Sequence, residues 1–176
     1  MHAKVKLFGH PIHPMLIAYP IAFYTATLVA LVIYAVGGDV FWFKVGFAAN
    51  VAGVAMAVLA ALPGFVDWAI GIPGGTPAKS TGWQHMLLNV LALVLFAITL
   101  GVHAGQLNDA SPEKPLGVIL AAVGVIATVL AGFRGWALIQ RHHVGIQLTT
   151  EQQRLEPEPP PTHRASAHGT ATGGQS

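Results

Sequence analysis

Residues 15–36 read MLIAYPIAFYTATLVALVIYAV and contain no charged side chain. Because the hydrocarbon core of a bilayer is about 30 Å thick, a helix needs about 20 mostly apolar residues to cross it. This segment meets that length, and three further segments do so at residues 45–66, 84–104 and 116–138. The sequence therefore predicts four transmembrane helices.

The composition of the whole chain agrees with a lipid environment. Charged residues make up only 9% of the 176 residues and hydrophobic residues 53%, whereas soluble domains carry roughly 25% charged residues. The absence of cysteine excludes disulfides and thiolate metal sites, so the nine histidines carry most of the remaining coordination chemistry. The formal charge of +2 gives no sign of nucleic-acid binding.

Short segments rich in Gly, Pro, Asn and Asp separate the predicted helices, at residues 37–39, 72–77 and 108–112. Short connections favour antiparallel neighbours. We therefore expect residues 1–148 to form an all-α, up-down-up-down bundle of four transmembrane helices. Residues 149–176 are rich in Pro, Glu and small polar residues. Such a composition buries too little apolar surface to fold, which predicts a disordered tail.

The distribution of Lys and Arg predicts how the bundle is oriented. An even number of helices places both termini on one face, and all Lys and Arg except Lys44 and Lys114 belong to that face. By the positive-inside rule, the N- and C-termini are expected to be cytoplasmic. The first apolar run is longer than the roughly 7–15 residues of a signal-peptide core, so we expect it to remain as a helix.

Small residues predict where the helices approach closely, because close packing drives helix association in lipid. They share one narrow face on the second and the fourth predicted helix. These faces comprise Gly46, Asn50, Gly53, Ala57, Ala60 and Gly64, and Gly117, Ala121, Gly124, Thr128, Ala131 and Gly135. We therefore expect these two helices to make the tightest contacts.

Asn89 is predicted to lie about one turn inside the membrane on the third helix. An amide at that depth needs a partner, so we expect it to face the bundle interior. Asn50 is a suitable type of partner, but it lies nearer the opposite face, so a direct bond between the two is not expected.

The predicted topology brings a group of polar side chains to the cytoplasmic boundary, where helices one and three begin and two and four end. The group comprises His10, His13, Asp67, His85, His142 and His143. The prolines after His10 and His13 bias both residues away from helix, which fixes the direction of their imidazoles and favours ligation. The sequence leaves open which of these two histidines faces the bundle.

Each member of this group also has a plainer interpretation. Pro14 is suited to the first turn of a helix, and an interfacial histidine such as His85 often binds only water or headgroups. Asp67 is a candidate to pair with Lys79 or Arg134. The His142–His143 pair, which follows an arginine, suits anionic lipid.

Three strings within this chain resemble a family of bacterial membrane proteins, domain of unknown function 2231. They are residues 9–16 (GHPIHPML) with Pro20, residues 82–89 (GWQHMLLN) and residues 141–146 (RHHVGI). The resemblance covers about residues 7–147 and implies a four-helix domain in the bacterial inner membrane. Some members of that family are joined to Rieske-type iron–sulfur domains, which implies a redox partner. At residue 143 this sequence has His where the resemblance would place Gly.

Two interpretations assign a cofactor to the polar group. In the first, one haem b lies between the first and third helices, with His13 and His85 as axial ligands and His10 or His142 as substitutes. In the second, a divalent metal such as Zn²⁺, Fe or Cu is held by imidazoles and one carboxylate. Its candidate ligands are His13, His85, Asp67, His142 and His143.

The competing class is a non-catalytic membrane subunit, or a small proton or solute transport component lined by His and Asp. We find no paired carboxylates, nucleophile motif or phosphate-binding loop, so hydrolase and nucleotide chemistry have no support. Whether the chain is an enzyme is left open by the sequence, and so is whether it forms a homo-oligomer. The expected partners are the lipid bilayer and, from the resemblance, a Rieske-type or other redox protein.

Overall fold

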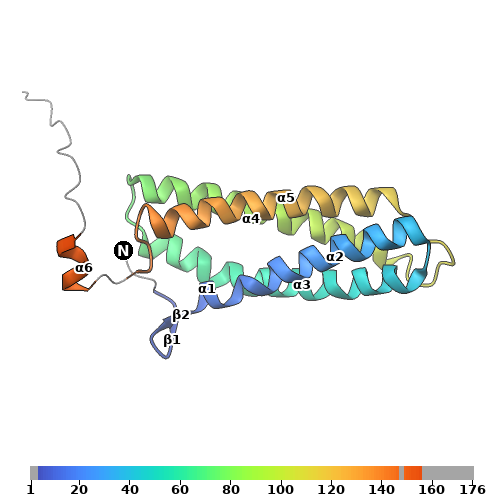
Figure 1. Cartoon of the computed structure of the whole chain (residues 1–176), viewed down its shortest axis with the longest axis horizontal. Coiled ribbons are helices and arrows are strands. Elements are labelled where there is room, and N and C mark those ends of the chain that lie inside the picture. Colours follow the sequence, from blue (N-terminus) through green and yellow to red (C-terminus); the bar gives the residue numbers. More distant parts are fainter. Residues whose placement is uncertain (1–3, 147–148, 156–176) are drawn as a thin grey trace, which may run out of the picture.

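The computed structural model describes residues 4–146 and 149–155, and it shows four long helices side by side (Figure 1). A short antiparallel hairpin and a small helix precede them, and a further short helix follows them. In chain order the elements are β1 (Lys6–Leu7), β2 (His10–Pro11), α1 (Ile12–Leu16), α2 (Ala18–Gly37), α3 (Val40–Val66), η1 (Asp67–Gly71), α4 (Pro77–Ala104), α5 (Pro115–Gln140) and α6 (Thr150–Leu155).

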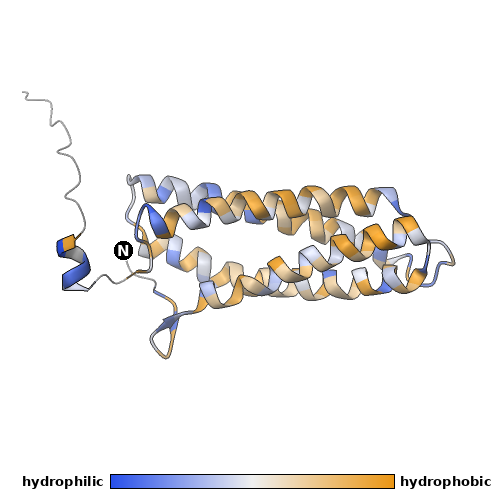
Figure 2. Cartoon of the chain, viewed as in Figure 1, coloured by the Kyte–Doolittle hydropathy of each residue, from blue (hydrophilic) through white to orange (hydrophobic). Residues whose placement is uncertain are grey.

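Four helical segments are long and apolar enough to cross a membrane, which confirms the all-α transmembrane bundle. They are Ile12–Gly37, Val40–Gly71, Pro77–Ala104 and Pro115–Gln140. Figure 2 shows apolar residues along the middle of the bundle and polar residues gathered at its ends. The helices extend beyond most of the predicted bounds. The predicted bounds follow the apolar runs, whereas each helix continues into the polar residues at the membrane boundary.

The helix starts follow from local capping. The Asp39 side chain accepts a hydrogen bond from the Phe41 N–H at 2.9 Å, so it caps the first turn of α3. The Thr76 hydroxyl accepts from the Lys79 N–H at 3.2 Å and caps α4. Proline occupies the first position of both α4 and α5, where its missing N–H has no helical partner to lose.

The bundle consists of two helical hairpins, with α2 packed along α3 and α4 packed along α5. Contacts between the hairpins run from α2 to α5 and from α3 to α4 and are sparser. The expectation that the second and fourth helices, α3 and α5, pack most tightly is therefore wrong. Their small-residue faces receive large side chains from the preceding helix of the same hairpin instead.

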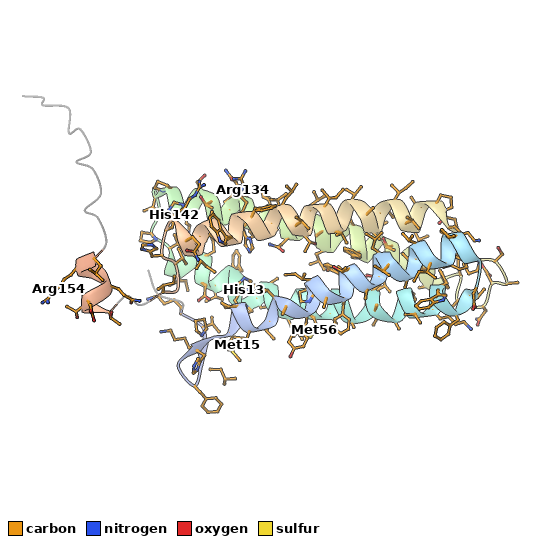
Figure 3. All side chains as sticks on the ribbon, in the orientation of Figure 1. His13, Met15, Met56, Arg134, His142 and Arg154 are labelled. Carbon is orange, nitrogen blue, oxygen red and sulfur yellow. The ribbon has the colours of Figure 1, made fainter. Side chains whose placement is uncertain are left out.

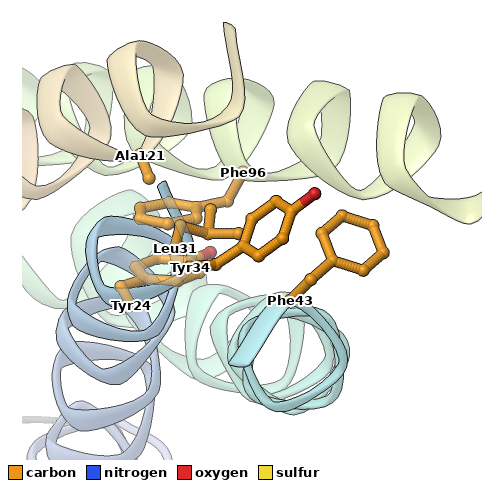
Figure 4. Close-up of a cluster of buried hydrophobic side chains, with 6 residues drawn as sticks. All are labelled: Tyr24, Leu31, Tyr34, Phe43, Phe96 and Ala121. Carbon is orange, nitrogen blue, oxygen red and sulfur yellow. The ribbon is translucent and has the colours of Figure 1, made fainter. Parts of the chain in front are cut away.

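We call the end of the bundle that carries the N-terminus and β1–β2 the terminal end, and the opposite end the distal end (Figure 1). A core of buried side chains occupies the distal half (Figure 4). Its members are Tyr24, Leu31, Tyr34, Phe43, Phe96 and Ala121. The rings of Tyr24 and Phe96 stack there with centroids 3.7 Å apart, which joins α2 of one hairpin to α4 of the other.

Part of the predicted disordered tail is helical. Thr149 and Gln152 exchange hydrogen bonds, with the Thr149 N–H donating to Gln152 Oε1 at 2.9 Å and the Gln152 N–H donating to Thr149 Oγ1 at 3.2 Å. This reciprocal pair is a capping box, which starts α6. Residues 149–155 of the predicted tail thus include a short capped helix, and the remainder, residues 156–176, lies outside the described residues.

Candidate functional site: a pair of anchored histidines

His13 lies in α1 at the terminal end of the bundle (Figure 3). Its Nδ1 is 2.8 Å from the backbone oxygen of Ala60 in α3. The imidazole rests on Gly64, where an added Cβ would come within 2.7 Å of Nδ1, so any larger residue at position 64 would displace the ring. A carbonyl and a glycine of α3 thus fix the position of His13.

His85 lies near the start of α4 and is held in the same way by the second hairpin. Its Nδ1 is 2.8 Å from the backbone oxygen of Ala131 in α5. A Cβ on Gly135 would lie 3.0 Å from His85 Cε1. Each hairpin therefore presents one half-buried imidazole that is anchored to a helix backbone.

The two anchored rings meet between the hairpins. The ring centroids of His13 and His85 are 6.2 Å apart and the ring planes are nearly perpendicular, at 88°. A carbonyl oxygen can only accept, so each Nδ1 must carry a proton and donate it. In the neutral tautomer this leaves the Nε2 lone pair of each histidine as the ligating atom, the arrangement typical of metal-bound histidine.

Asn89 contributes to this site from one turn along α4. Its side-chain Nδ2 donates to the His85 carbonyl oxygen at 2.8 Å and lies 3.2 Å from His85 Nε2. The expectation that Asn89 faces the bundle interior is wrong, because its side chain is exposed and its own helix satisfies the amide. Asn50 is buried, and its Nδ2 donates to the Phe96 carbonyl oxygen at 3.1 Å.

Asp67 binds backbone N–H groups and does not form the predicted ion pair with Lys79 or Arg134. Its Oδ1 accepts from the backbone N–H groups of Lys4 at 2.6 Å and Val5 at 3.0 Å, which ties the N-terminal segment to η1. Lys79 instead donates from Nζ to the carbonyl oxygens of Trp68, Ala69 and Ile72.

The other predicted ligands lie apart from the histidine pair. His10 is exposed in β2 and its Nδ1 is 3.0 Å from the Phe8 carbonyl oxygen. His142 Nε2 is 3.3 Å from the Thr81 hydroxyl. Within residues 4–146 and 149–155, no group of three or more His, Asp or Glu side chains is placed to hold a metal ion. The structure thus joins His13 to His85 and does not assemble the wider cluster.

His143 ends α5 in a left-handed conformation with φ 50°. Its N–H donates to the Ile139 carbonyl at 3.1 Å, and the Val144 N–H donates to the Leu138 carbonyl at 3.0 Å. The bond from the His143 N–H reaches back four residues, as in the αL helix cap, in which the residue at the His143 position is usually glycine. The resemblance therefore places glycine at the position where the backbone is left-handed, a conformation that glycine adopts without strain.

An internal repeat underlies the paired geometry, and it was not recognised from the sequence. In the first hairpin His13, Tyr24 and Leu31 rest on Gly64, Gly53 and Gly46; in the second, His85, Phe96 and His103 rest on Gly135, Gly124 and Gly117. The first three side chains precede their counterparts by 72 positions, and the first three glycines by 71. This common spacing is a signal that a self-comparison of the sequence could have found.

Both hairpins start at the terminal end, so the repeats are parallel and are related by a pseudo-twofold axis along the bundle. Equivalent residues of α1–α2 and α4 meet near that axis. This is the reason that His13 faces His85 and that the Tyr24 ring stacks on the Phe96 ring. The repeat therefore places two equivalent imidazoles together.

The family model described as predicted membrane protein (DUF2231) matches residues 9–148. The chain belongs to this family. The region shared with the DUF2231 family includes all four long helices and both anchored histidines, so the candidate site lies inside the family domain. Neither the curated proteins nor the solved structures include a match to the chain.

Proposed function

We propose that this chain is a haem-binding redox module of the membrane, with His13 and His85 as the two axial ligands of one haem b. The observation that carries the proposal is the pair of imidazoles from separate hairpins, each with its Nδ1 bound to a backbone carbonyl. Such anchoring fixes the tautomer and the ring direction and leaves Nε2 as the ligand atom.

The spacing of the rings fits two ligands of one iron. A metal–imidazole bond is about 2 Å long, and a ring nitrogen lies roughly 1 Å from its ring centre, so two imidazoles on opposite sides of one ion have centroids about 6 Å apart. The observed separation is 6.2 Å. The donor set therefore suits a single bis-imidazole centre.

The number of ligands favours haem over a bare ion. A structural zinc site uses four protein ligands and a catalytic one usually three. The described residues supply only two histidines at this position, with no third His, Asp or Glu grouped with them. When bound, a haem supplies the remaining ligands and one-electron chemistry, so two histidines are sufficient.

The position of the pair suggests how such a module would work. Both histidines lie at the terminal end, so electrons would be exchanged with a partner on that face. The Rieske-type partner that the family resemblance implies, and the cytoplasmic orientation of this face, remain predictions.

The test is a reduced-minus-oxidised absorption spectrum of detergent-purified protein from cells with ample haem, with metal analysis of the same sample. We expect a haem b signal of about one per chain, lost in both His13→Ala and His85→Ala. His10→Ala and His142→Ala are matched controls that should retain the signal, because neither residue contacts the pair.

Two other outcomes would overturn the proposal. A colourless protein with bound metal would indicate an ion site, and a protein with neither haem nor metal would favour a non-catalytic or transport subunit. In the latter case, substitution of His13 or His85 would change the assembly or the stability of the protein and would leave its absorption spectrum unchanged.

A further inference from the structure

The distal half of the bundle contains a second histidine site. His103, in the last turn of α4, is 1% exposed, and neither ring nitrogen has a hydrogen-bond partner among the described residues. Its imidazole packs edge-on against Phe43, with centroids 4.9 Å apart, and rests on Gly117. A neutral imidazole has one N–H donor and one acceptor, and a buried donor or acceptor left unpaired destabilises the fold.

Packing does not require a histidine at this position. The equivalent residue of the first hairpin is Leu31, which rests on Gly46 as His103 rests on Gly117. Leucine therefore fills the same kind of space without unpaired nitrogens. The imidazole of His103 adds a polar group that the fold does not need.

Two more buried polar residues also have an apolar counterpart in the other repeat. Asn50 and Tyr24 are buried, and their repeat counterparts are the apolar Ala121 and Phe96. Asn50 Oδ1 and the Tyr24 hydroxyl have no hydrogen-bond partner among the described residues, as is true of the His103 nitrogens. Figure 4 shows the Tyr24 ring stacked on the Phe96 ring. At these three positions the repeats differ in polarity, and each polar side chain has an unpaired buried atom.

Glu113 lies at the distal end, two residues before α5 begins. Its Oε1 accepts from the Leu116 N–H at 2.6 Å, and its Oε2 is buried without a partner among the described residues. Leu116 is next to Gly117, on which the His103 imidazole rests, so the carboxylate lies at the same end of α5 as that ring. Three neighbouring polar groups have other contacts. The Tyr34 hydroxyl donates to the Pro112 carbonyl at 2.7 Å, Lys114 Nζ lies over the Tyr34 ring, and Gln106 Oε1 accepts from the Glu113 N–H at 2.7 Å.

We propose that Glu113 and His103 form a hydrated proton-exchange site that opens at the distal end and leads toward Asn50 and Tyr24. A proton leaves the carboxylic acid of Glu113, crosses bound water and protonates a ring nitrogen of His103; it returns by the same route. Buried polar atoms such as these are normally paired by ordered water, which would supply the missing bonds. The site does not depend on haem at the terminal end.

The test is solid-state NMR of the full chain, labelled with ¹⁵N-histidine, in lipid vesicles between pH 5 and 8. His103 is assigned by the loss of its signals in His103→Leu, the substitution that copies the first repeat. We expect His103 to contact water and to exchange protons, and Glu113→Gln to slow that exchange at least fivefold. Lys114→Gln is the matched control from the same loop and should leave the exchange rate unchanged.

A His103 signal that stays in one neutral tautomer, with no water contact at any pH in this range, would overturn the proposal. So would an exchange rate that Glu113→Gln leaves unaltered. If His103→Leu does not fold, His103 can be assigned in the wild type from its contacts with Gly117. The comparison of the wild type with Glu113→Gln then still tests the proposal. Haem content is measured on the same samples and is expected to be unchanged, which separates this site from the histidine pair.

Discussion

At the scale of single residues, the candidate site depends on glycines that make room for imidazoles. Gly64 and Gly135 are each in contact with one of the paired histidines. The sequence revealed both as members of small-residue faces, but it did not reveal what they contact. Whether a glycine on a transmembrane helix faces another helix backbone or accepts a ring depends on which helix is adjacent, and composition does not contain that information.

Gly64→Ala is predicted to weaken the site, because the new Cβ would lie 2.7 Å from His13 Nδ1 while that ring is held by Ala60. Overpacking of this kind costs on the order of 1–3 kcal/mol, so thermal unfolding in detergent should occur at a lower temperature and the haem content should fall. Gly132→Ala is the matched control, since nothing lies within 4 Å of its Cβ. Equal loss of haem in both variants would contradict this role for Gly64.

His143→Gly is predicted to stabilise the protein. His143 adopts φ 50° at the end of α5, a left-handed conformation that costs a non-glycine residue roughly 1–2 kcal/mol. Thermal unfolding should therefore shift upward. The control Ala137→Gly, within the last turn of α5, should lower stability by about 1 kcal/mol. A lower melting temperature for His143→Gly would show that the contacts of the His143 side chain outweigh its backbone strain.

At the scale of elements, the four helices were predictable because length and hydropathy alone specify a membrane span. Their pairing was only partly predictable. Short loops correctly indicated antiparallel neighbours, but the small-residue faces of α3 and α5 suggested the wrong pair. The role of Asp67 was also not predictable, since its partners are backbone N–H groups far away in sequence.

Asp67→Asn is predicted to release the N-terminal segment without removing the cofactor. The amide lacks the charge that strengthens both hydrogen bonds from Lys4 and Val5, and bonds to a charged group contribute about 1.5–3 kcal/mol. Amide hydrogen exchange at residues 4–7 should become faster while the haem spectrum stays unchanged. Loss of haem with no change in exchange would restore Asp67 as a candidate ligand.

At the scale of the whole molecule, the bundle is two parallel copies of one hairpin. Most packing lies within each hairpin, and the two anchored histidines belong to different copies. His13 and His85 could be selected from the sequence as residues expected at one boundary. Their equivalence, and the asymmetry of His103 against Leu31, could be seen only after the glycine contacts had aligned the two repeats.

This architecture predicts that the chain can be divided. If it is cut between Gly74 and Gly75 and the halves are co-expressed, the two hairpins should associate in the membrane, because each buries its own helix pair. A tag on one half should co-purify the other, and haem should be present only when both halves are. Haem bound by either half alone would show that His13 and His85 do not act as a pair.

The central claim is that two imidazoles from the two repeats ligate one haem iron, and the electron paramagnetic resonance spectrum of the oxidised, haem-loaded protein tests it most directly. Two imidazole ligands give low-spin ferric haem, and the 88° angle between the rings predicts the strongly anisotropic signal of perpendicular ligand planes. Because haem is expected to be lost in His13→Ala and in His85→Ala, the low-spin signal should be absent from both variants. A high-spin spectrum in the unaltered protein, or a low-spin spectrum that survives His13→Ala and His85→Ala, would contradict the account.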